Sequence, residues 1–213
     1  GGETTVLVGP RSDRRSPTAS DLIELTSRLR AAGYLAAVTP ALSPRDAEPF
    51  VAAGFSERER LHLLSRPLTV APELPGSPTS PGRRWHQRRV LEIDARAFDG
   101  FWRFDHETLR SARRATPRSR YRVLRHDGRI GGYAVCGRAG SRGYLQRLAV
   151  DPALQGRGYG SSLVLDALGW LHRSGSDSVL VNTQETNQRA LDLYQHLGFR
   201  SEPDGLVVLG WTA

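Results

Sequence analysis

A glycine-rich loop places the strongest constraint on how this chain can fold. The loop Gln155-Gly156-Arg157-Gly158-Tyr159-Gly160 follows the apolar stretch Leu148-Ala149-Val150 and precedes a run with helical periodicity. A strand, a glycine loop and a helix in this order point successive backbone N–H groups outward at the positive end of the helix dipole. The glycines let an anion approach without a Cβ in the way, and Arg157 adds a charged donor. The loop therefore predicts a cradle for a diphosphate group.

Two common diphosphate ligands are excluded by the residues around this loop. A dinucleotide-binding unit needs an acidic residue about 20 positions further on to hold a ribose, but the next predicted strand ends in Asn182-Thr183. A Walker-type loop needs a lysine, and the chain contains none. The predicted ligand is therefore neither NAD nor ATP.

The rest of the C-terminal part predicts an alternation of helices and strands. Asp127-Gly128 signals a tight hairpin turn, Asn187 can cap a helix, and Gly198 can close it. Apolar spacing gives the helix after the glycine loop one buried face. We expect helices over 87–98 and 105–115, after the loop and after Asn187, and strands over 121–126, 130–138, 143–150, 179–182 and 206–209.

The N-terminal part predicts the same order of elements as the chain after Gly143. Strands are expected over 5–8, 35–39 and 60–64, and helices over 19–32 and 44–53. A shift of 144 residues superimposes Thr39 on Thr183, Phe50 on Tyr194, Gly54 on Gly198 and Phe55 on Phe199, and a shift of 142 superimposes Gly33 on Gly175. This pattern indicates an internal repeat, the alternative being two α/β units that share turn residues by chance.

A stretch rich in proline and glycine separates the two parts. Residues 72–82 contain four prolines and show no apolar periodicity, which is typical of a linker. We therefore expect an N-terminal half over 1–71, a linker over 72–82 and a C-terminal domain over 83–213.

Composition points to a soluble cytoplasmic protein without a metal site. The chain is 38% hydrophobic, and none of its apolar runs approaches the roughly 20 residues that span a bilayer. Its beginning lacks the pattern of a signal peptide. The single cysteine, Cys136, excludes an intramolecular disulfide, and the six histidines are scattered singly. We expect neither a metal nor a membrane as partner.

The positive charge is concentrated in the C-terminal part. Residues 1–82 carry nine arginines and nine acids, and the whole formal charge of +8 lies in residues 83–213. Every basic residue is arginine, a bias typical of GC-rich codons, so the basic total is weak evidence for nucleic acid as a partner. A binder of nucleic acid driven by arginine is kept as an alternative, and its affinity would depend steeply on salt.

The motifs around the loop, taken together, resemble the acetyl-CoA signature of the GNAT superfamily of N-acyltransferases. The residues that carry the resemblance are Leu148-Ala149-Val150-Asp151-Pro152, Gln155 to Gly160, Asn187, Ala190, Leu193-Tyr194 and Leu197-Gly198-Phe199. It is close over 143–200, and the order of elements matches back to about Gln87. The resemblance implies a layered α/β (α+β) fold in which helices flank a mixed, mostly antiparallel sheet.

The N-terminal repeat resembles a second, truncated half of the same kind, so that the chain would hold two tandem related units. Where a glycine loop should stand, the sequence is Arg11-Ser12-Asp13-Arg14-Arg15-Ser16-Pro17. Without glycines, this half is implied to be degenerate and to bind no CoA.

The resemblance also implies an activity and roles for residues. The chain would move an acetyl group from acetyl-CoA, its co-substrate, to a primary amine by direct attack. The backbone of Leu148, Ala149 and Val150 would pair with pantetheine, and residues Gln155 to Gly160 would hold the diphosphate. Asn187 would hydrogen-bond the cofactor, cap its helix, or do both. Tyr194 would protonate the leaving thiolate, the alternative being an aromatic residue that fills the core.

The general base is left open. Many members of the superfamily carry Glu at the position of Gln146, and an amide cannot take up a proton at neutral pH. Water with backbone carbonyls could serve, or an amine of modest pKa could attack without a strong base. The candidates from elsewhere, each of which also fits a solvated surface, are Asp105, His106, Glu107 and Glu185.

The acceptor is left open as well. The aromatic segment Phe101-Trp102-Arg103-Phe104 fits either a hydrophobic plug or a wall of the acceptor groove. The amine could belong to a small molecule or a protein, and the chain could be a monomer or a homodimer. A CoA-binding sensor or structural module without catalysis is kept as an alternative, because Gln146 and the degenerate half both depart from the family pattern.

Overall fold

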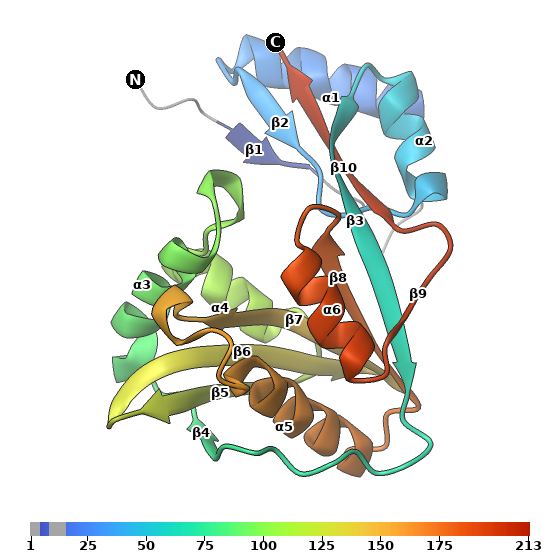
Figure 1. Ribbon diagram of the computed structural model, residues 1–213. Helices are drawn as coiled ribbons and strands as arrows, with labels where there is room; N and C mark the ends of the chain where they lie inside the picture. The colour runs from blue at the N-terminus through green and yellow to red at the C-terminus, as the bar shows by residue number, and fades with distance from the viewer. Residues whose placement is uncertain (1–4, 9–15) are drawn as a thin grey trace. The chain divides into compact units, whose positions relative to one another are not determined.

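The computed structural model describes residues 5–8 and 16–213, which form two compact units (Figure 1). The first unit comprises the described residues up to Leu64 together with Asn182–Leu191 and Ser201–Ala213. The second comprises Ser65–Val181 and Asp192–Arg200. Within the described residues, no helix combines the length and the apolar character needed to cross a membrane.

The first unit consists of a small sheet and two helices. Its elements are β1 (Thr5–Leu7), α1 (Ala19–Ala31), β2 (Ala36–Val38), α2 (Pro44–Ala52), most of β3 (Ser56–Pro67) and β10 (Leu206–Thr212). The strand order is β1-β2-β10-β3, with β1 parallel to β2 and β10 antiparallel to both of its neighbours. Thr18 and Ser43 cap the two helices by accepting from the N–H groups of Asp21 and Asp46.

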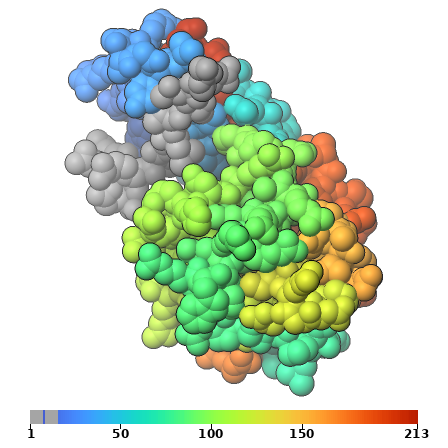
Figure 2. Space-filling model, turned by 90° about the vertical axis from the view of Figure 1, so that its left-hand side faces the viewer, coloured from blue at the N-terminus to red at the C-terminus, as the bar shows by residue number. Residues whose placement is uncertain are grey.

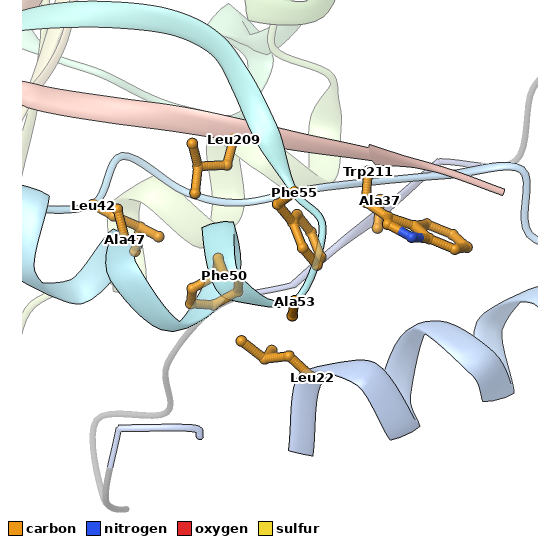
Figure 3. Close-up of a cluster of buried hydrophobic side chains, with 9 residues drawn as sticks. All are labelled: Leu22, Ala37, Leu42, Ala47, Phe50, Ala53, Phe55, Leu209 and Trp211. Carbon is orange, nitrogen blue, oxygen red and sulfur yellow. The ribbon is translucent and has the colours of Figure 1, made fainter. Parts of the chain in front are cut away.

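The core of the first unit is built from both ends of the chain (Figure 3). Leu209 and Trp211 from β10 lie among residues of α1, β2 and α2. The rings of Phe50 and Phe55 meet edge to face, with centroids 5.4 Å apart. The buried members are Leu22, Ala37, Leu42, Ala47, Phe50, Ala53, Phe55, Leu209 and Trp211. The N-terminal segment therefore buries its apolar side chains with the help of the last strand.

One buried hydroxyl joins Thr39, the residue after β2, to the C-terminal strand, and its removal should destabilise the first unit. The Leu209 N–H donates to Thr39 Oγ1 at 2.9 Å, and Thr39 is 1% exposed. Thr39→Val keeps the side-chain shape but leaves this N–H unpaired, so we expect the free energy of unfolding to fall by about 1–3 kcal/mol. A urea titration measures the change. Thr39→Ser keeps the hydroxyl and should lose less; equal losses for the two variants would contradict this role.

The second unit is a mixed, mostly antiparallel sheet with helices on both faces. Its strands run in the order β8-β7-β6-β5-β4, and β7 and β8 are parallel while the other neighbours are antiparallel. The strands are β4 (Thr79–Pro81), β5 (Arg118–His126), β6 (Arg129–Ala139), β7 (Arg142–Val150) and β8 (Ser178–Gln184). The helices are α3 (Gln87–Ala97), α4 (His106–Arg114), α5 (Tyr159–Arg173) and α6 (Gln188–His196). β8 and α6 contribute residues to both units.

Alternation along the strands explains why both faces are covered. Tyr133 and Val135 of β6 point into a core shared with Val90, Ile93 and Leu109 of α3 and α4. The intervening residues face α5, where Leu163 lies 3.2 Å from the position that a Cβ on Gly132 would take. Figure 2 shows the face on which α3, α4 and the segment between them, in green, form much of the surface. The fold class expected from the sequence is therefore observed in this unit.

β3 and the expected linker differ most from the sequence expectation. β3 covers Ser56–Pro67 instead of 60–64, because a long strand with charged residues on its exposed face lacks a continuous apolar run. The expected linker holds β4, which pairs antiparallel with β5; Pro81 is tolerated there because β4 is an edge strand. In the same stretch, the Ser77 N–H donates to Ser162 Oγ of α5 at 3.0 Å. The division into 1–71, 72–82 and 83–213 stays a prediction.

Candidate functional site

β7 leaves one of its edges open over most of its length. Along the side towards β8, paired residues run from Arg142 with Ser178 to Tyr144 with Leu180, and the described register contains no pair between these strands beyond that point. On its other side, β7 stays paired with β6 as far as Val150. Backbone donors and acceptors of residues 145–150 that point away from β6 are therefore available to an extended ligand with amide groups.

A β-bulge lies where the two strands part. Val135 of β6 pairs with Arg147, but the next residue, Cys136, pairs with Leu145. Gln146 is therefore the extra residue, and a bulge redirects both the side chain and the backbone groups of that residue. Its Oε1 atom is buried and has no hydrogen-bond partner among the described residues. An unsatisfied acceptor of this kind commonly marks a site that a ligand or water completes.

The glycine loop has the backbone geometry expected of an anion cradle. Gly156 and Gly158 have φ angles of +80° and +76°, in the left-handed region that favours glycine. A Cβ at either position would meet no described atom within 4 Å, so the space in front of the loop is open. Gly158 is the N-cap of α5 and supplies no side-chain bond, which leaves the first N–H groups of the helix available. These residues fit a diphosphate.

Asp151 anchors the loop to the body of the second unit. Its carboxylate accepts hydrogen bonds from Arg89 at 2.8 Å and from Arg96 at 3.0 Å, and its backbone N–H donates to the Gly131 carbonyl at 2.8 Å. The side chain of Asp151 is buried at 3% exposure. Arg89 and Arg96, about two turns apart on the same side of α3, therefore hold the strand end from which the loop departs.

Two side chains of the predicted loop form hydrogen bonds within the protein, and a third is exposed to solvent. Gln155 Nε2 donates back to the Val150 carbonyl at 3.3 Å. The Tyr159 hydroxyl shares a hydrogen bond of 2.8 Å with Nδ1 of His126, the last residue of β5. Arg157 is exposed. Gln155 and Tyr159 thus shape the loop and offer backbone groups to a ligand, whereas Arg157 can offer its guanidinium.

Tyr194 lies buried in the second unit on α6. The residue is 5% exposed, and its ring packs against Phe199 with centroids 5.6 Å apart. Burial raises the pKa of the Tyr194 phenol well above its usual range, and the nearby Arg147 guanidinium opposes part of that rise. The hydroxyl is therefore protonated at neutral pH, as a general acid must be. α6 meets the start of α5 where Leu193 lies 3.2 Å from the Cβ position of Gly160.

Asn187 is a helix cap in the structure. Its Oδ1 accepts from the Ala190 N–H at 3.1 Å, which satisfies one of the free donors at the start of α6. By its contacts Asn187 belongs to the first unit, while Tyr194 belongs to the second. The contact between Asn187 and the cofactor stays a prediction.

The buried ion pair between Arg147 and Asp94 was not anticipated from the sequence. Arg147, the residue after the bulge, donates from Nε and Nη2 to the two oxygens of Asp94, both at 2.7 Å. Asp94 on α3 is 0% exposed and Arg147 is 8% exposed. The Tyr133 hydroxyl donates to the same carboxylate. Burial, and after it the negative charge of Asp94, raises the pKa of the Tyr133 phenol.

This ion pair fastens the segment between α3 and α4 onto β7. The Arg147 guanidinium lies between the rings of Phe98 and Phe104, 3.4 and 3.9 Å from their centroids, and Nη2 also donates to the Trp102 carbonyl at 2.6 Å. The Phe104 N–H donates to Asp94 at 2.6 Å. Phe104 is therefore packed against the ion pair, whereas Phe101 is 42% exposed. Whether this segment also forms a wall of the acceptor groove stays a prediction.

The four acidic or histidine candidates for a base are engaged elsewhere or exposed. Asp105 caps α4, and hydrogen bonds from the Thr108 N–H and hydroxyl lower the pKa of its carboxyl, which makes it a weaker base. Glu107 is paired with Arg110 at 2.7 Å. His106 and Glu185 are exposed, and Glu185 belongs to the first unit. Among the described residues, no group of His, Cys, Asp and Glu has the arrangement of a metal site.

Sequence reasoning missed three parts of this site, the bulge, the Asp151 anchor and the Arg147–Asp94 pair. One signal was present, because Arg147 occupies the buried face of β7 between the apolar residues Leu145 and Ala149. A charged residue at a buried strand position needs a partner, but its partner lies 53 residues away and no local pattern identifies it.

Comparison with known proteins places these features in context. Residues 88–199 match the model described as Acetyltransferase (GNAT) family. A mycothiol acetyltransferase from Thermobispora bispora is 30% identical over 170 residues, 70% of this chain and 57% of that protein. One from Acidimicrobium ferrooxidans is 28% identical over 223 residues, 93% of this chain and 71% of that protein. Human N-alpha-acetyltransferase 30 is 41% identical over 58 residues, 27% of this chain and 16% of that protein.

Solved structures share the fold at low sequence identity. A tandem GNAT protein from the clavulanic acid biosynthesis pathway has a TM-score of 0.69 at 16% sequence identity. The match covers 91% of this chain and 69% of that one. A GCN5-related N-acetyltransferase from Sphaerobacter thermophilus has a TM-score of 0.62 at 17% identity, covering 89% and 65%. At these identities the likeness is one of fold.

Proposed function

We propose that this chain, which belongs to the GNAT acetyltransferase family, transfers an acetyl group from acetyl-CoA to a primary amine by direct attack. The observation that carries the proposal is the open edge of β7, which runs directly into a glycine loop at the start of α5. The edge suits the amide groups of pantetheine and the loop suits the diphosphate. Acetyl-CoA contains both, in that order.

Different residues of the second unit bind different parts of acetyl-CoA. Backbone groups of Leu148, Ala149 and Val150 pair with pantetheine. The N–H groups from Gln155 to Gly160 hold the diphosphate, with Arg157 as a charged donor. Acetyl-CoA, when bound, supplies the activated acyl group.

The bulge and Tyr194 supply the chemistry on the protein side. Backbone N–H groups around Gln146 point away from the regular ladder and can donate to the oxygen on which negative charge develops. Tyr194 keeps its proton at neutral pH and gives it to the departing sulfur. Gln146 cannot act as a base, so the amine attacks in its neutral form or loses its proton through water. A non-catalytic CoA-binding module is the second candidate, and it is favoured by the absence of a carboxylate at Gln146.

The N-terminal half is proposed to be a degenerate repeat of the C-terminal one. In support, Gly33 and Gly175, each two residues after α1 and α5, have φ angles of +83° and +79°. Gly54 and Gly198, each two residues after α2 and α6, have φ angles of +87° and +80°. The Phe55 N–H donates to the Phe50 carbonyl as the Phe199 N–H donates to the Tyr194 carbonyl, both at 3.0 Å. The predicted glycine-free loop, Arg11 to Pro17, lies outside the described residues as far as Arg15.

The relatives suggest which acceptors to test first. Two of them are named mycothiol acetyltransferases, although the chain spans 57% of the length of one and 71% of the other. We therefore propose the unacetylated form of mycothiol as the first member of a panel that also holds amino acids, polyamines and peptides with a free N-terminus. Calorimetry with acetyl-CoA and a colorimetric assay of thiol release test the proposal. No binding at millimolar acetyl-CoA would overturn it, and binding without release across the panel would favour the non-catalytic module.

The glycine loop itself can be tested without knowing the acceptor. Gly158→Ala places a Cβ on a residue with φ +76°, which costs about 1–2 kcal/mol of backbone strain and puts a methyl group where the diphosphate lies. We expect the affinity for acetyl-CoA, measured by calorimetry, to fall about tenfold or more. Gly33→Ala is the matched control, because Gly33 has φ +83° in the first unit. Equal losses of affinity for both variants would contradict the role of the loop.

A further inference from the structure

An arginine-lined cavity lies in the second unit apart from the site described above. It has a volume of about 470 Å³ and is lined by Arg84, Gln87, Arg110, Arg113, Arg114 and Ser119. These residues come from the 3-10 turn Arg84–His86, the start of α3, the last two turns of α4 and the start of β5. Four arginines, one from the 3-10 turn and three from α4, therefore line one space.

The lining is rich in hydrogen-bond donors and contains no acid. Guanidinium groups donate and do not accept. Arg110 is paired with Glu107 at 2.7 Å, and Arg113 lies over the Tyr121 ring, 5.0 Å from its centroid. Arg84 and Arg114 form no ion pair with an acid in the described part of the chain. Like charges held together in this way repel one another, and an anion between them removes the repulsion.

The Ser119 side of the cavity lies away from the glycine loop, and Arg113 lies away from the segment that Arg147 holds. On β6, Gly131 bonds the start of the loop and Gly137 pairs with Ser119, and six residues of strand span roughly 20 Å. On α4, Arg113 lies eight residues beyond the cap Asp105, which is roughly 12 Å along the helix. A ligand in this cavity would not occupy the proposed acetyl-CoA site.

We propose that this cavity is a second anion site, which binds a compact ligand with at least two phosphate groups. Planar guanidinium forks match phosphate oxygens in bidentate geometry. A space of about 470 Å³ falls within the range of roughly 300–1,000 Å³ typical of small-molecule sites and exceeds the needs of one inorganic phosphate. The lining lacks the apolar side chains that hold uncharged ligands. The proposal is independent of the acetyltransferase activity.

Calorimetry with inorganic triphosphate, in the presence of saturating acetyl-CoA, tests the proposal. We expect one binding event per chain, an affinity that falls steeply between 50 and 200 mM salt in the manner of roughly three or more neutralised charges, and a loss of about tenfold for Arg84→Ala and for Arg114→Ala. Both arginines are exposed, so these variants should fold. The double variant should lose more than either single variant, by an amount that reports the coupling between two residues that share one ligand.

The matched control is Arg129→Ala, which removes an exposed arginine at the far end of β6 from Ser119. It should bind triphosphate like the unmodified chain. Equal losses for Arg129→Ala and Arg114→Ala would show diffuse attraction and overturn the proposal. So would the absence of binding at low salt, or a loss caused by Arg157→Ala, which would place the anion in the glycine loop. If a 12-nucleotide single-stranded DNA bound more tightly with the same sensitivity to the variants, the small ligand would be replaced by a nucleic acid.

Discussion

Tyr194→Phe should lower turnover by about 10²- to 10⁴-fold, the range by which a positioned general acid accelerates a reaction. The ring of Tyr194 packs against Phe199 and the residue is buried, so Phe keeps the packing and removes the proton donor alone. The dissociation constant of acetyl-CoA, measured by calorimetry, should stay within about threefold of that of the unmodified chain. Equal changes in turnover and affinity would assign Tyr194 to binding instead of proton transfer.

The pH dependence of turnover tests the role of Tyr194 as a general acid independently of the substitution. Burial raises the pKa of Tyr194, so the phenol keeps its proton beyond pH 10, the ordinary pKa of tyrosine. An acid is active in its protonated form, and a raised pKa moves the loss of that form to higher pH. Turnover at saturating substrates should therefore show no decline from this group below about pH 10. A decline below pH 10 that disappears in Tyr194→Phe would contradict the assignment.

Arg147→Met should lower the free energy of unfolding by about 3–5 kcal/mol, because it leaves a buried carboxylate without its cation. Asp94 is 0% exposed and accepts two hydrogen bonds from Arg147. Methionine retains much of the length of the side chain and its contact with Phe98 and Phe104, so the loss reports mainly on charge. A urea titration followed by tryptophan fluorescence measures it.

A double variant distinguishes the buried charge from a general disturbance of the core. Asp94→Asn in the Arg147→Met background removes both charges and keeps an acceptor for the Phe104 N–H and a partner for the Tyr133 hydroxyl. It should recover a large part of the lost stability. Arg129→Met, at an exposed position, should stay within about 0.5 kcal/mol of the unmodified chain. A double variant no more stable than Arg147→Met alone would show that the ion pair is not the cause.

The fold class and the family could be predicted from the sequence because both depend on local patterns. Asp127-Gly128 forms the predicted turn with positive φ angles, Asn187 caps α6, and Gly198 closes it with φ +80°. Capping and turn formation need only a few neighbouring residues. The strands of the second unit likewise follow their apolar residues and end within a few positions of the expected bounds.

The partners of those elements could not be predicted in the same way. β10 is a short apolar run that fits several sheets, and it pairs with β2 and β3 of the first unit. Its place depends on where Leu209 and Trp211 can be buried, which is a property of the assembled core. β4 was missed because three residues with a proline at a sheet edge carry no periodic signal.

The sequence by itself determined the loop from Gln155 to Gly160, since the positive φ angles of Gly156 and Gly158 favour glycine. Tertiary structure alone decided what surrounds that loop. The parting of β7 from β8, the bulge at Gln146 and the pairing of Arg147 with Asp94 join residues that are distant in the chain. The physical reason is that the energy of an unpaired strand edge or of a buried charge depends on the groups beside it. Tertiary packing brings those groups together, and no local pattern in the sequence specifies them.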